Sequence, residues 1–142
     1  MSELSDKETL RYSRHLLLRE VGLEGQLALK SSTVAVVGAG GLGSPALLYL
    51  AAAGIGTLIL IDDDEVELSN LQRQVLYKIN HLGQSKVAAA GKVLASLNNQ
   101  IEIVTHCQKL DESNAAYMLK GADIVLDCSD NFATRYTVNR FC

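Results

Sequence analysis

The sequence predicts an α/β fold in which a largely parallel sheet is flanked by helices and preceded by an N-terminal helical segment. Short runs of β-branched and other apolar residues, typical of buried parallel strands, alternate with helical patterns along the chain. A glycine-rich run at residues 38–43 lies between the first of these strands and the next helix. The second strand ends in a run of carboxylates. These three observations together define the fold class.

The N-terminal segment begins with a capping box, Ser5-Asp-Lys-Glu8, in which each side chain satisfies an unpaired amide of a helix start. The leucine pattern after it predicts a helix of roughly 15 residues. Gly22 is expected to end this helix, and a short helix around residues 26–30 follows. Residues 1–31 are therefore predicted to form an N-terminal helical segment.

The remaining elements alternate in type. Pro45 suits the first turn of a helix that Gly54 ends, and Asp111 suits the cap of a helix that Gly121 stops. The predicted strands are residues 32–38, 57–62, 101–107 and 122–128. The predicted helices are residues 42–54, a turn or two within 70–77, then 85–98, 111–121 and 130–142. No repeat, low-complexity tract or linker interrupts this alternation.

Composition narrows the function classes. The 142 residues suit one domain with a real core, and 48% hydrophobic with 20% charged residues is ordinary for a globular protein. A net charge of −3 without a basic stripe argues against nucleic acid and membranes as partners, and no apolar run reaches the ~18–20 residues of a membrane helix. The polar start is no secretory signal. Three cysteines without a CxxC pair argue against a disulfide scaffold or a complete zinc site, so the cytoplasm is the expected compartment.

The glycine run fits G-x-G-x-x-G in the strand–turn–helix context that this motif requires. The first glycine permits a tight turn, the second lets a phosphate approach the backbone, and the third lets helix and strand pack closely. Asp62 follows at the distance expected for a residue that accepts hydrogen bonds from ribose hydroxyls. Residues 32–142 are therefore predicted to form a Rossmann-like nucleotide-binding domain. The alternative is a plain glycine-rich turn in an α/β fold.

The stretch after the second strand offers acids first and anion-binding groups next. Five carboxylates fall within residues 62–67, after which Asn70 and Arg73 lie three residues apart on one helical face. Lys86 begins the next predicted helix. Two cations and an amide near a glycine loop suggest a triphosphate whose charge must be neutralised during chemistry, which a dehydrogenase does not need. The alternative for each cation, taken singly, is a solvated surface position.

Asp130 and Asn131 belong to the run "CSDN" (residues 128–131), which ends the fourth predicted strand and opens the last predicted helix. Ligands of open α/β sheets bind beyond the carboxyl ends of the strands, so both residues are expected near Gly41 and Asp62. A carboxylate there could hold Mg²⁺ together with phosphate oxygens and water. The alternative is that Asp130 caps the following helix, and the two roles are compatible. Cys128 is expected to pack at the end of a buried strand.

These pieces, "RYSRH", "GAGGLGS", "DDDEVELSNLQRQ", "GQSKV" and "LDCSDN", resemble the ThiF/MoeB/HesA family, relatives of ubiquitin-activating enzymes. The resemblance runs from about Leu10 to the C-terminus. Members of that family adenylate the C-terminal glycine carboxylate of a ubiquitin-like sulfur-carrier protein with ATP and Mg²⁺. The resemblance therefore implies this activity, these cofactors, a carrier of the thiamine or molybdopterin pathway as partner, and a homodimer.

The resemblance also implies roles for single residues. Gly41 lies against the phosphates, Asp62 takes the ribose hydroxyls, and Asp130 coordinates Mg²⁺ with Asn131 beside it. The arginine of the family's "RYxRH/Q" motif enters the active site of the other subunit, and this role falls to Arg14. The implied catalytic residues are Arg14, Arg73, Lys86 and Asp130. The implied nucleotide-binding residues are Gly38, Gly40, Gly41, Gly43, Asp62, Asp64, Ser69, Asn70, Leu71, Gln72, Arg73, Lys86, Asp130 and Asn131.

The sequence also departs from the family. Members are considerably longer, and their second half carries CxxC pairs that bind structural zinc, a carrier-docking surface and often a cysteine on a crossover loop. None of these is present here, so the chain is expected to be the front part of a longer protein, and no cysteine is assigned as ligand or nucleophile. Two alternatives stay open: an NAD-dependent oxidoreductase domain, and a non-catalytic member of the same family.

Overall fold

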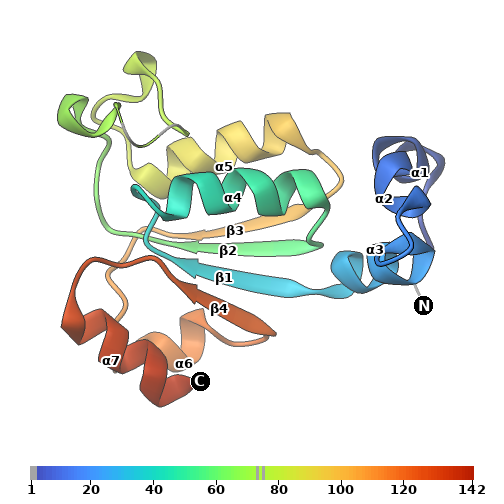
Figure 1. Ribbon diagram of the computed structural model, residues 1–142. Helices are drawn as coiled ribbons and strands as arrows, with labels where there is room; N and C mark the ends of the chain where they lie inside the picture. The colour runs from blue at the N-terminus through green and yellow to red at the C-terminus, as the bar shows by residue number, and fades with distance from the viewer. Residues whose placement is uncertain (1–2, 73, 75) are drawn as a thin grey trace.

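A computed structural model describes residues 3–72, 74 and 76–142. Its centre is a sheet of four parallel strands, β1 (Thr33–Val37), β2 (Thr57–Ile61), β3 (Glu102–His106) and β4 (Ile124–Asp127), in the order β3-β2-β1-β4 (Figure 1). The chain moves outward from β1 to β3 and then returns to place β4 on the other side of β1. The predicted α/β fold with a largely parallel sheet is confirmed.

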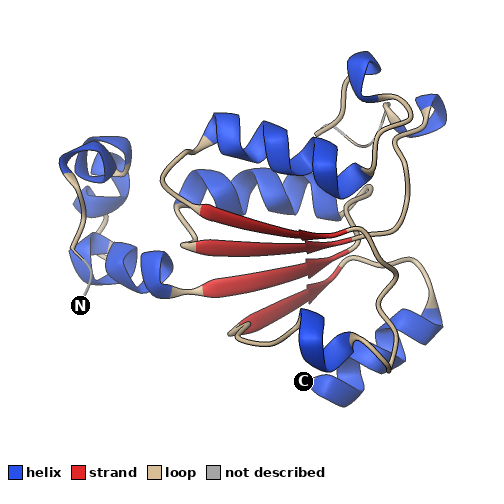
Figure 2. Ribbon diagram, turned by 180° about the vertical axis from the view of Figure 1, so that it is seen from behind, coloured by secondary structure: helices blue, strands red, loops and turns tan. Residues whose placement is uncertain are grey.

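Helices cover both faces of the sheet (Figures 1 and 2). On one face α4 (Gly43–Ala53) and α5 (Lys86–Leu97) bury Val34, Val36, Leu58 and Leu60. On the other face α6 (Ala115–Met118) and α7 (Phe132–Phe141) lie over Ala35, Val37, Ile59 and Ile61. The two central strands are thus buried on both sides, which is why they appear in the sequence as unbroken apolar runs.

The N-terminal helices α1 (Asp6–Arg11), α2 (Ser13–Leu17) and α3 (Gly22–Ser31) lie at the end of the sheet where the strands begin (Figure 1). Buried amide side chains fasten them to the rest of the fold. Gln26 donates a 2.9 Å hydrogen bond from Nε2 to the Ala53 carbonyl, and its Oε1 lies 2.9 Å from Nδ1 of His15. Asn98 donates to the Tyr12 hydroxyl at 2.7 Å and to the Ala51 carbonyl at 2.8 Å. The segment therefore packs on the C-terminal ends of α4 and α5.

The N-terminal segment follows its prediction in part. The capping box is confirmed, since Ser5 N donates to Glu8 Oε2 at 2.8 Å and Glu8 N donates to Ser5 Oγ at 3.2 Å. The single helix of roughly 15 residues is wrong, because the chain leaves helical geometry at Tyr12, whose buried hydroxyl is held by Asn98. Gly22 does not end a helix but begins α3, with a φ of 57° that favours glycine.

Two other helix predictions need correction. Residues 70–77 were expected to hold a turn or two of helix, but the described part contains only the end of the 3₁₀ turn η1 (Leu68–Asn70), and the next turn is η2 (Ile79–His81). The helix expected at 111–121 is shortened to α6, because the Asp111 carboxylate accepts hydrogen bonds from Ser113 and Asn114 and closes a separate turn. Among the described residues, no helix is long and apolar enough to cross a membrane.

Candidate functional site

A cavity of about 680 Å³ opens at the carboxyl ends of the strands. Loops that follow all four strands form its walls, together with the first residue of α5 and the first turn of α7. This is the position at which ligands bind in open parallel sheets, next to the strand where the order reverses. Its lining includes eight of the predicted residues: Gly38, Gly40, Gly41, Asp62, Asp64, Lys86, Asp130 and Asn131.

The glycine loop turns sharply between β1 and α4. Gly38 has a φ of 96°, and a Cβ built there would lie 2.7 Å from the Cys128 carbonyl oxygen. A Cβ at Gly43 would lie 1.9 Å from the Gly38 carbonyl oxygen. Both positions therefore exclude any side chain, and they let the loop pass close to β4 and fold back on itself. Gly43 permits this close packing within the loop and is not part of the cavity wall.

Backbone amides of this loop are available to an anion. The N–H groups of Gly40, Gly41 and Leu42 pair with no acceptor among the described residues. They precede the 11-residue helix α4, whose N-terminus adds a partial positive charge. Successive free amides at a helix start bind phosphate and similar anions.

Three side chains hold Ala39, the residue before these amides. Ala39 N donates to Asp62 Oδ2 at 2.7 Å, and the Ala39 carbonyl accepts from the Tyr77 hydroxyl at 2.6 Å and from Ser44 Oγ at 3.2 Å. Burial, with a further contribution from the Asp62 charge, raises the pKa of Tyr77, so its hydroxyl remains a donor at neutral pH. The shape of the loop is thus fixed from outside the loop.

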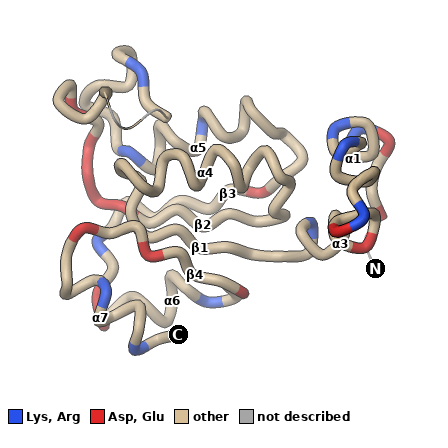
Figure 3. The backbone as a smooth tube through the Cα atoms, viewed as in Figure 1, with Lys and Arg blue, Asp and Glu red and all other residues tan. Residues whose placement is uncertain are grey.

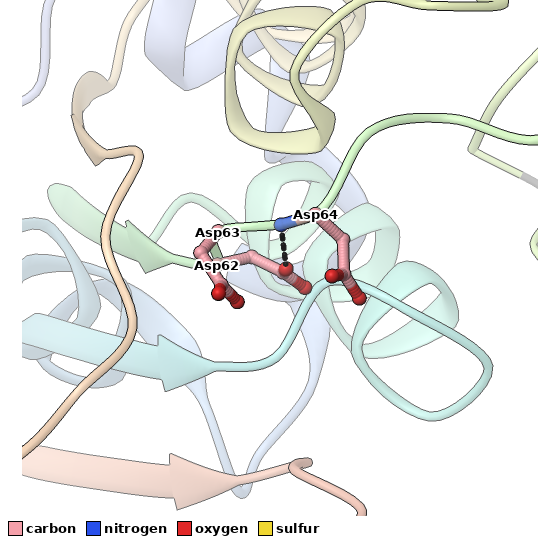
Figure 4. A group of neighbouring side chains, drawn as sticks. All are labelled: Asp62, Asp63 and Asp64. Atoms are coloured by element: carbon pink, nitrogen blue, oxygen red, sulfur yellow. Dashed lines mark hydrogen bonds between the residues drawn. The ribbon is translucent and has the colours of Figure 1, made fainter.

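Three carboxylates meet at the end of β2. Asp62, Asp63 and Asp64 each offer an oxygen within 4.8 Å of the others, and Asp62 Oδ1 accepts a 2.8 Å hydrogen bond from the Asp64 amide (Figure 4). Acidic residues colour this stretch red in Figure 3. Asp62 already accepts two backbone amides, so it shapes the loop, a role that the sequence analysis did not include. Its role toward a ribose stays a prediction.

Lys86 brings a buried cation to the cavity. Its side chain is only 6% exposed, and Nζ lies 3.8 Å from Asp64 Oδ2. Ser85 caps α5 by accepting from Ala88 N at 3.1 Å, and the Lys86 amide donates to the Asp64 carbonyl at 2.9 Å. These bonds fix the start of α5 beside the end of β2. The alternative of a solvated surface position is therefore wrong for Lys86.

Asp64 is crowded by negative charge. Its pKa is raised by partial desolvation and by the charges of Asp62, Asp63 and Asp130, which together outweigh the attraction of Lys86. A carboxylate with a raised pKa gains from a nearby cation, because a cation offsets the repulsion that the folded protein maintains. Asp130 is exposed on the cavity wall and lies near enough to contribute to this repulsion.

The helix cap at the start of α7 is Asn131 and not Asp130. Asn131 Oδ1 accepts a 2.8 Å hydrogen bond from the Thr134 amide. The alternative that Asp130 caps the helix is therefore wrong, and its carboxylate is left free of that role. Asn131 lies beside it in the cavity wall, although its side-chain oxygen is engaged in the cap.

Several predicted residues lie elsewhere. Ser69, Asn70, Leu71 and Gln72 belong to η1 and the turn after it and are not part of the cavity wall. Arg73 lies outside the described residues. Arg14 is exposed on α2, at the opposite end of the sheet from the cavity (Figure 1).

The cavity wall also contains polar residues that the sequence analysis did not assign, namely Gln74, Gln108, Lys109, Ser129, Thr134 and Arg135. Gln74 is the last residue of the quoted stretch "DDDEVELSNLQRQ", but the sequence analysis gave it no role. Gln108 and Lys109 follow β3, and the rule that ligands bind beyond strand ends would have found them. Arg135 lies one helical turn after Asn131, which is a weaker signal.

The fold and the loop define a Rossmann-like α/β domain with a glycine-rich turn and unpaired backbone amides at its cavity. The model of the ThiF family matches residues 12–142, so this chain belongs to the ThiF family. The adenylyltransferase and sulfurtransferase MOCS3 of Aedes aegypti is 51% identical over 142 residues, 100% of this chain and 32% of that protein. The probable adenylyltransferase/sulfurtransferase MoeZ of Mycobacterium tuberculosis (strain ATCC 25618 / H37Rv) is 49% identical over 138 residues, 97% of this chain and 35% of that protein.

Solved structures agree with this assignment. The crystal structure of E. coli tRNA N6-threonylcarbamoyladenosine dehydratase, TcdA, in complex with ATP superposes with a TM-score of 0.92 at 27% identity, covering 99% of this chain and 58% of that one. The chain spans about a third of the length of the curated relatives it matches. The resemblance to the ThiF/MoeB/HesA family is confirmed.

Proposed function

We propose that this chain is the nucleotide-binding portion of an ATP-dependent adenylyltransferase that activates the C-terminal glycine carboxylate of a ubiquitin-like sulfur-carrier protein. The names of MOCS3 and MoeZ support an adenylyltransferase, and the TcdA structure supports ATP as the ligand of such a fold. The carrier belongs to a molybdopterin-type or thiamine-type pathway. A structural zinc site is expected in the longer family members only.

The buried Lys86 is the observation that carries the proposal. A lysine that is almost removed from water, with one exposed carboxylate 3.8 Å away, is poorly compensated in the free protein. An anion in the cavity would compensate it. Together with the free amides of Gly40 and Gly41, this cation suits a polyphosphate better than the diphosphate of a dinucleotide, whose dehydrogenases need no buried cation.

The proposed reaction uses these groups for binding and charge neutralisation. An oxygen of the carrier's carboxylate attacks the α-phosphorus, an acyl–phosphate bond forms, and the bond between the α-phosphorus and its bridging oxygen breaks. Pyrophosphate leaves with the bonding electrons. Lys86 and the loop amides hold the phosphates while charge shifts toward the leaving group, and Asp62 holds the ribose.

The acidic wall fits Mg²⁺. This ion prefers carboxylate oxygens and water, and Asp64 and Asp130 present carboxylates whose mutual repulsion a cation would relieve. Asp130 is the predicted metal ligand. Bound Mg²⁺ would neutralise phosphate charge during the displacement.

Arg14 is proposed to act on the site of a second copy of the chain. In the motif "RYSRH" three of the other residues are held by their own chain: Arg11 donates to the Leu97 carbonyl at 3.0 Å, Tyr12 is bonded to Asn98, and His15 is bonded to Gln26. Arg14 makes no hydrogen bond or ion pair with a described residue and is exposed on α2, away from the cavity of its own chain. This supports a homodimer in which the arginine is presented outward.

Carrier-dependent ATP–pyrophosphate exchange tests the proposal. Exchange is expected with a sulfur carrier whose C-terminal glycine is intact, and Asp130→Ala is expected to abolish it without lowering the melting temperature. Thr9→Ala, on α1 and far from the cavity, is the matched control. Tight NAD binding with no response to ATP–Mg²⁺ in calorimetry would contradict the proposal and favour an oxidoreductase domain.

A further inference from the structure

Gln74 is a buried polar side chain in the wall of the cavity. The residue is 4% exposed, and its Oε1 is the only fully buried side-chain oxygen or nitrogen that lacks a hydrogen-bond partner among the described residues. The great majority of buried side-chain polar atoms in proteins are hydrogen-bonded, so an unpaired one in a residue of the cavity wall needs an explanation, and a ligand that brings the partner supplies one.

The position of Gln74 is set by the glycine loop. A Cβ built at Gly40 would lie 3.4 Å from Gln74 Nε2, an ordinary van der Waals distance, so the amide group lies beside the loop. Three residues later, the Tyr77 hydroxyl holds the Ala39 carbonyl at 2.6 Å. The segment that carries Gln74 is thus attached to the loop beside the free amides.

The other buried amide side chains show what a structural role looks like here. Gln26 uses both ends of its amide, and Asn98 uses its nitrogen twice and its oxygen once, toward Gln100 N at 3.0 Å. Each of them is paired, and each lies at the amino end of the sheet. Gln74 differs in both respects, because its oxygen is unpaired and it lies in the cavity.

We propose that Gln74 contacts the bound nucleotide directly, and that its Oε1 accepts a hydrogen bond from an O–H group that the nucleotide brings. This rests on the proposed function. Phosphate oxygens only accept hydrogen bonds, so they cannot pair with Oε1. The adenine amino group lies at the opposite end of ATP from the phosphates, whereas Gln74 lies beside Gly40, at the loop proposed to hold those phosphates. Two donors remain near that loop: a ribose hydroxyl, or a water molecule on the Mg²⁺ that accompanies ATP.

The test compares Gln74→Met with the wild type in calorimetric titrations. Methionine has a similar length and shape but no amide. We expect the dissociation constant of ATP–Mg²⁺ to rise about tenfold, as for the loss of one hydrogen bond in a dry site. Titrations with 2′-deoxyATP, 3′-deoxyATP and metal-free ATP then identify the donor. The wild type should lose affinity when the true donor is removed, and Gln74→Met should lose little more.

Gln26→Met is the matched control, since it removes an equally buried amide that is fully paired. It should lower the melting temperature without ligand and leave the ATP dissociation constant unchanged. Gln74→Met should raise the ATP dissociation constant and should not lower the melting temperature without ligand. Unchanged ATP affinity in Gln74→Met overturns the inference. The inference is also overturned if Gln74→Met discriminates among the four ligands as strongly as the wild type does, because either result leaves Gln74 a structural residue. A wild-type protein that binds no ATP contradicts the proposed function itself, and this inference then falls with it.

Discussion

Buried polar groups are hydrogen-bonded at one end of the sheet and lack close partners at the other. At the amino ends of the strands, Gln26, Asn98 and Glu8 are buried and hydrogen-bonded, and Lys30 lies 2.9 Å from the Glu8 carboxylate. At the carboxyl ends, Gln74 Oε1 is unpaired and Lys86 is buried with one distant partner. The loop amides there are also free.

The difference shows where the chain gains stability and where it is prepared for a ligand. A fully paired buried network fixes one geometry and stabilises it, whereas unpaired or crowded groups raise the free energy of the folded state until a partner arrives. Buried groups without partners and crowded like charges are expected at functional sites. Three predictions test whether the two ends really differ in this way, from the largest expected effect to the smallest.

The first prediction concerns activity and joins the two ends in one experiment. If Arg14 serves the cavity of a second copy, both Arg14→Ala and Lys86→Ala should be inactive in carrier-dependent exchange. Mixing them should form dimers in which one site lacks both cations and the other lacks neither. With random exchange half the dimers are mixed, each with one working site of two, so activity should return to about a quarter of the wild type.

The control is each variant mixed with itself, which should stay inactive. A mixture as inactive as its parents would mean that Arg14 acts within its own chain or that the protein is a monomer. Either result would contradict the proposal that Arg14 serves the site of a second copy.

The second prediction concerns stability. Asn98→Leu keeps the volume but leaves the Tyr12 hydroxyl and the Ala51 carbonyl without their donor. Because both groups are buried in the contact that holds the N-terminal helices, the free energy of unfolding should fall by about 2–4 kcal/mol in urea titrations. Asn99→Leu, one residue on and exposed, is the control. A loss below about 0.5 kcal/mol would mean that this network contributes no stability.

The fold was predictable where local pattern and burial agree. The strands β1 and β2 are buried on both faces, so they appear as continuous apolar runs between turn signals. The break at Tyr12 was not predictable, because the group that holds it, Asn98, is 86 residues away in the sequence. Local propensity favours one long helix there, whereas the structure places a non-helical residue at Tyr12, whose hydroxyl bonds to the distant Asn98.

The candidate site was predictable where it follows from topology. The glycine loop and Asp62 follow from the rule that strand ends converge at one edge, and the structure brings them together. The burial of Lys86 and Gln74 could not be read from spacing, since it depends on how α5 and the segment before it return over the loop. The choice of Asn131 over Asp130 as the helix cap was equally hidden, because both residue types suit that position.

The third prediction compares two carboxylates, one at each end, as a function of pH. Burial alone would raise the pKa of Glu8, but hydrogen bonds from the Ser5 backbone and from Lys30 outweigh it, so the pKa lies below its ordinary value of 4.5. Glu8 therefore stabilises the fold above that pH, and the contribution disappears as the pH falls through the folded-state pKa. Glu8→Gln should lower the free energy of unfolding by about 1 kcal/mol at pH 7 and by progressively less below pH 4.5.

Asp64 should behave in the opposite sense. Its pKa lies above the ordinary value of 3.8, so the folded protein holds the proton more tightly, and stability falls as the pH rises through that window. Asp64→Asn should therefore raise the stability at pH 7, but only by a few tenths of a kcal/mol, because the side chain is 69% exposed and screened by water. In 1 M NaCl the Debye length is about 3 Å, and this small gain should vanish while most of the Glu8 effect persists. Urea titrations of both variants between pH 4 and 7 measure the two differences side by side. Two curves of the same sign would contradict the contrast between the paired end and the crowded end.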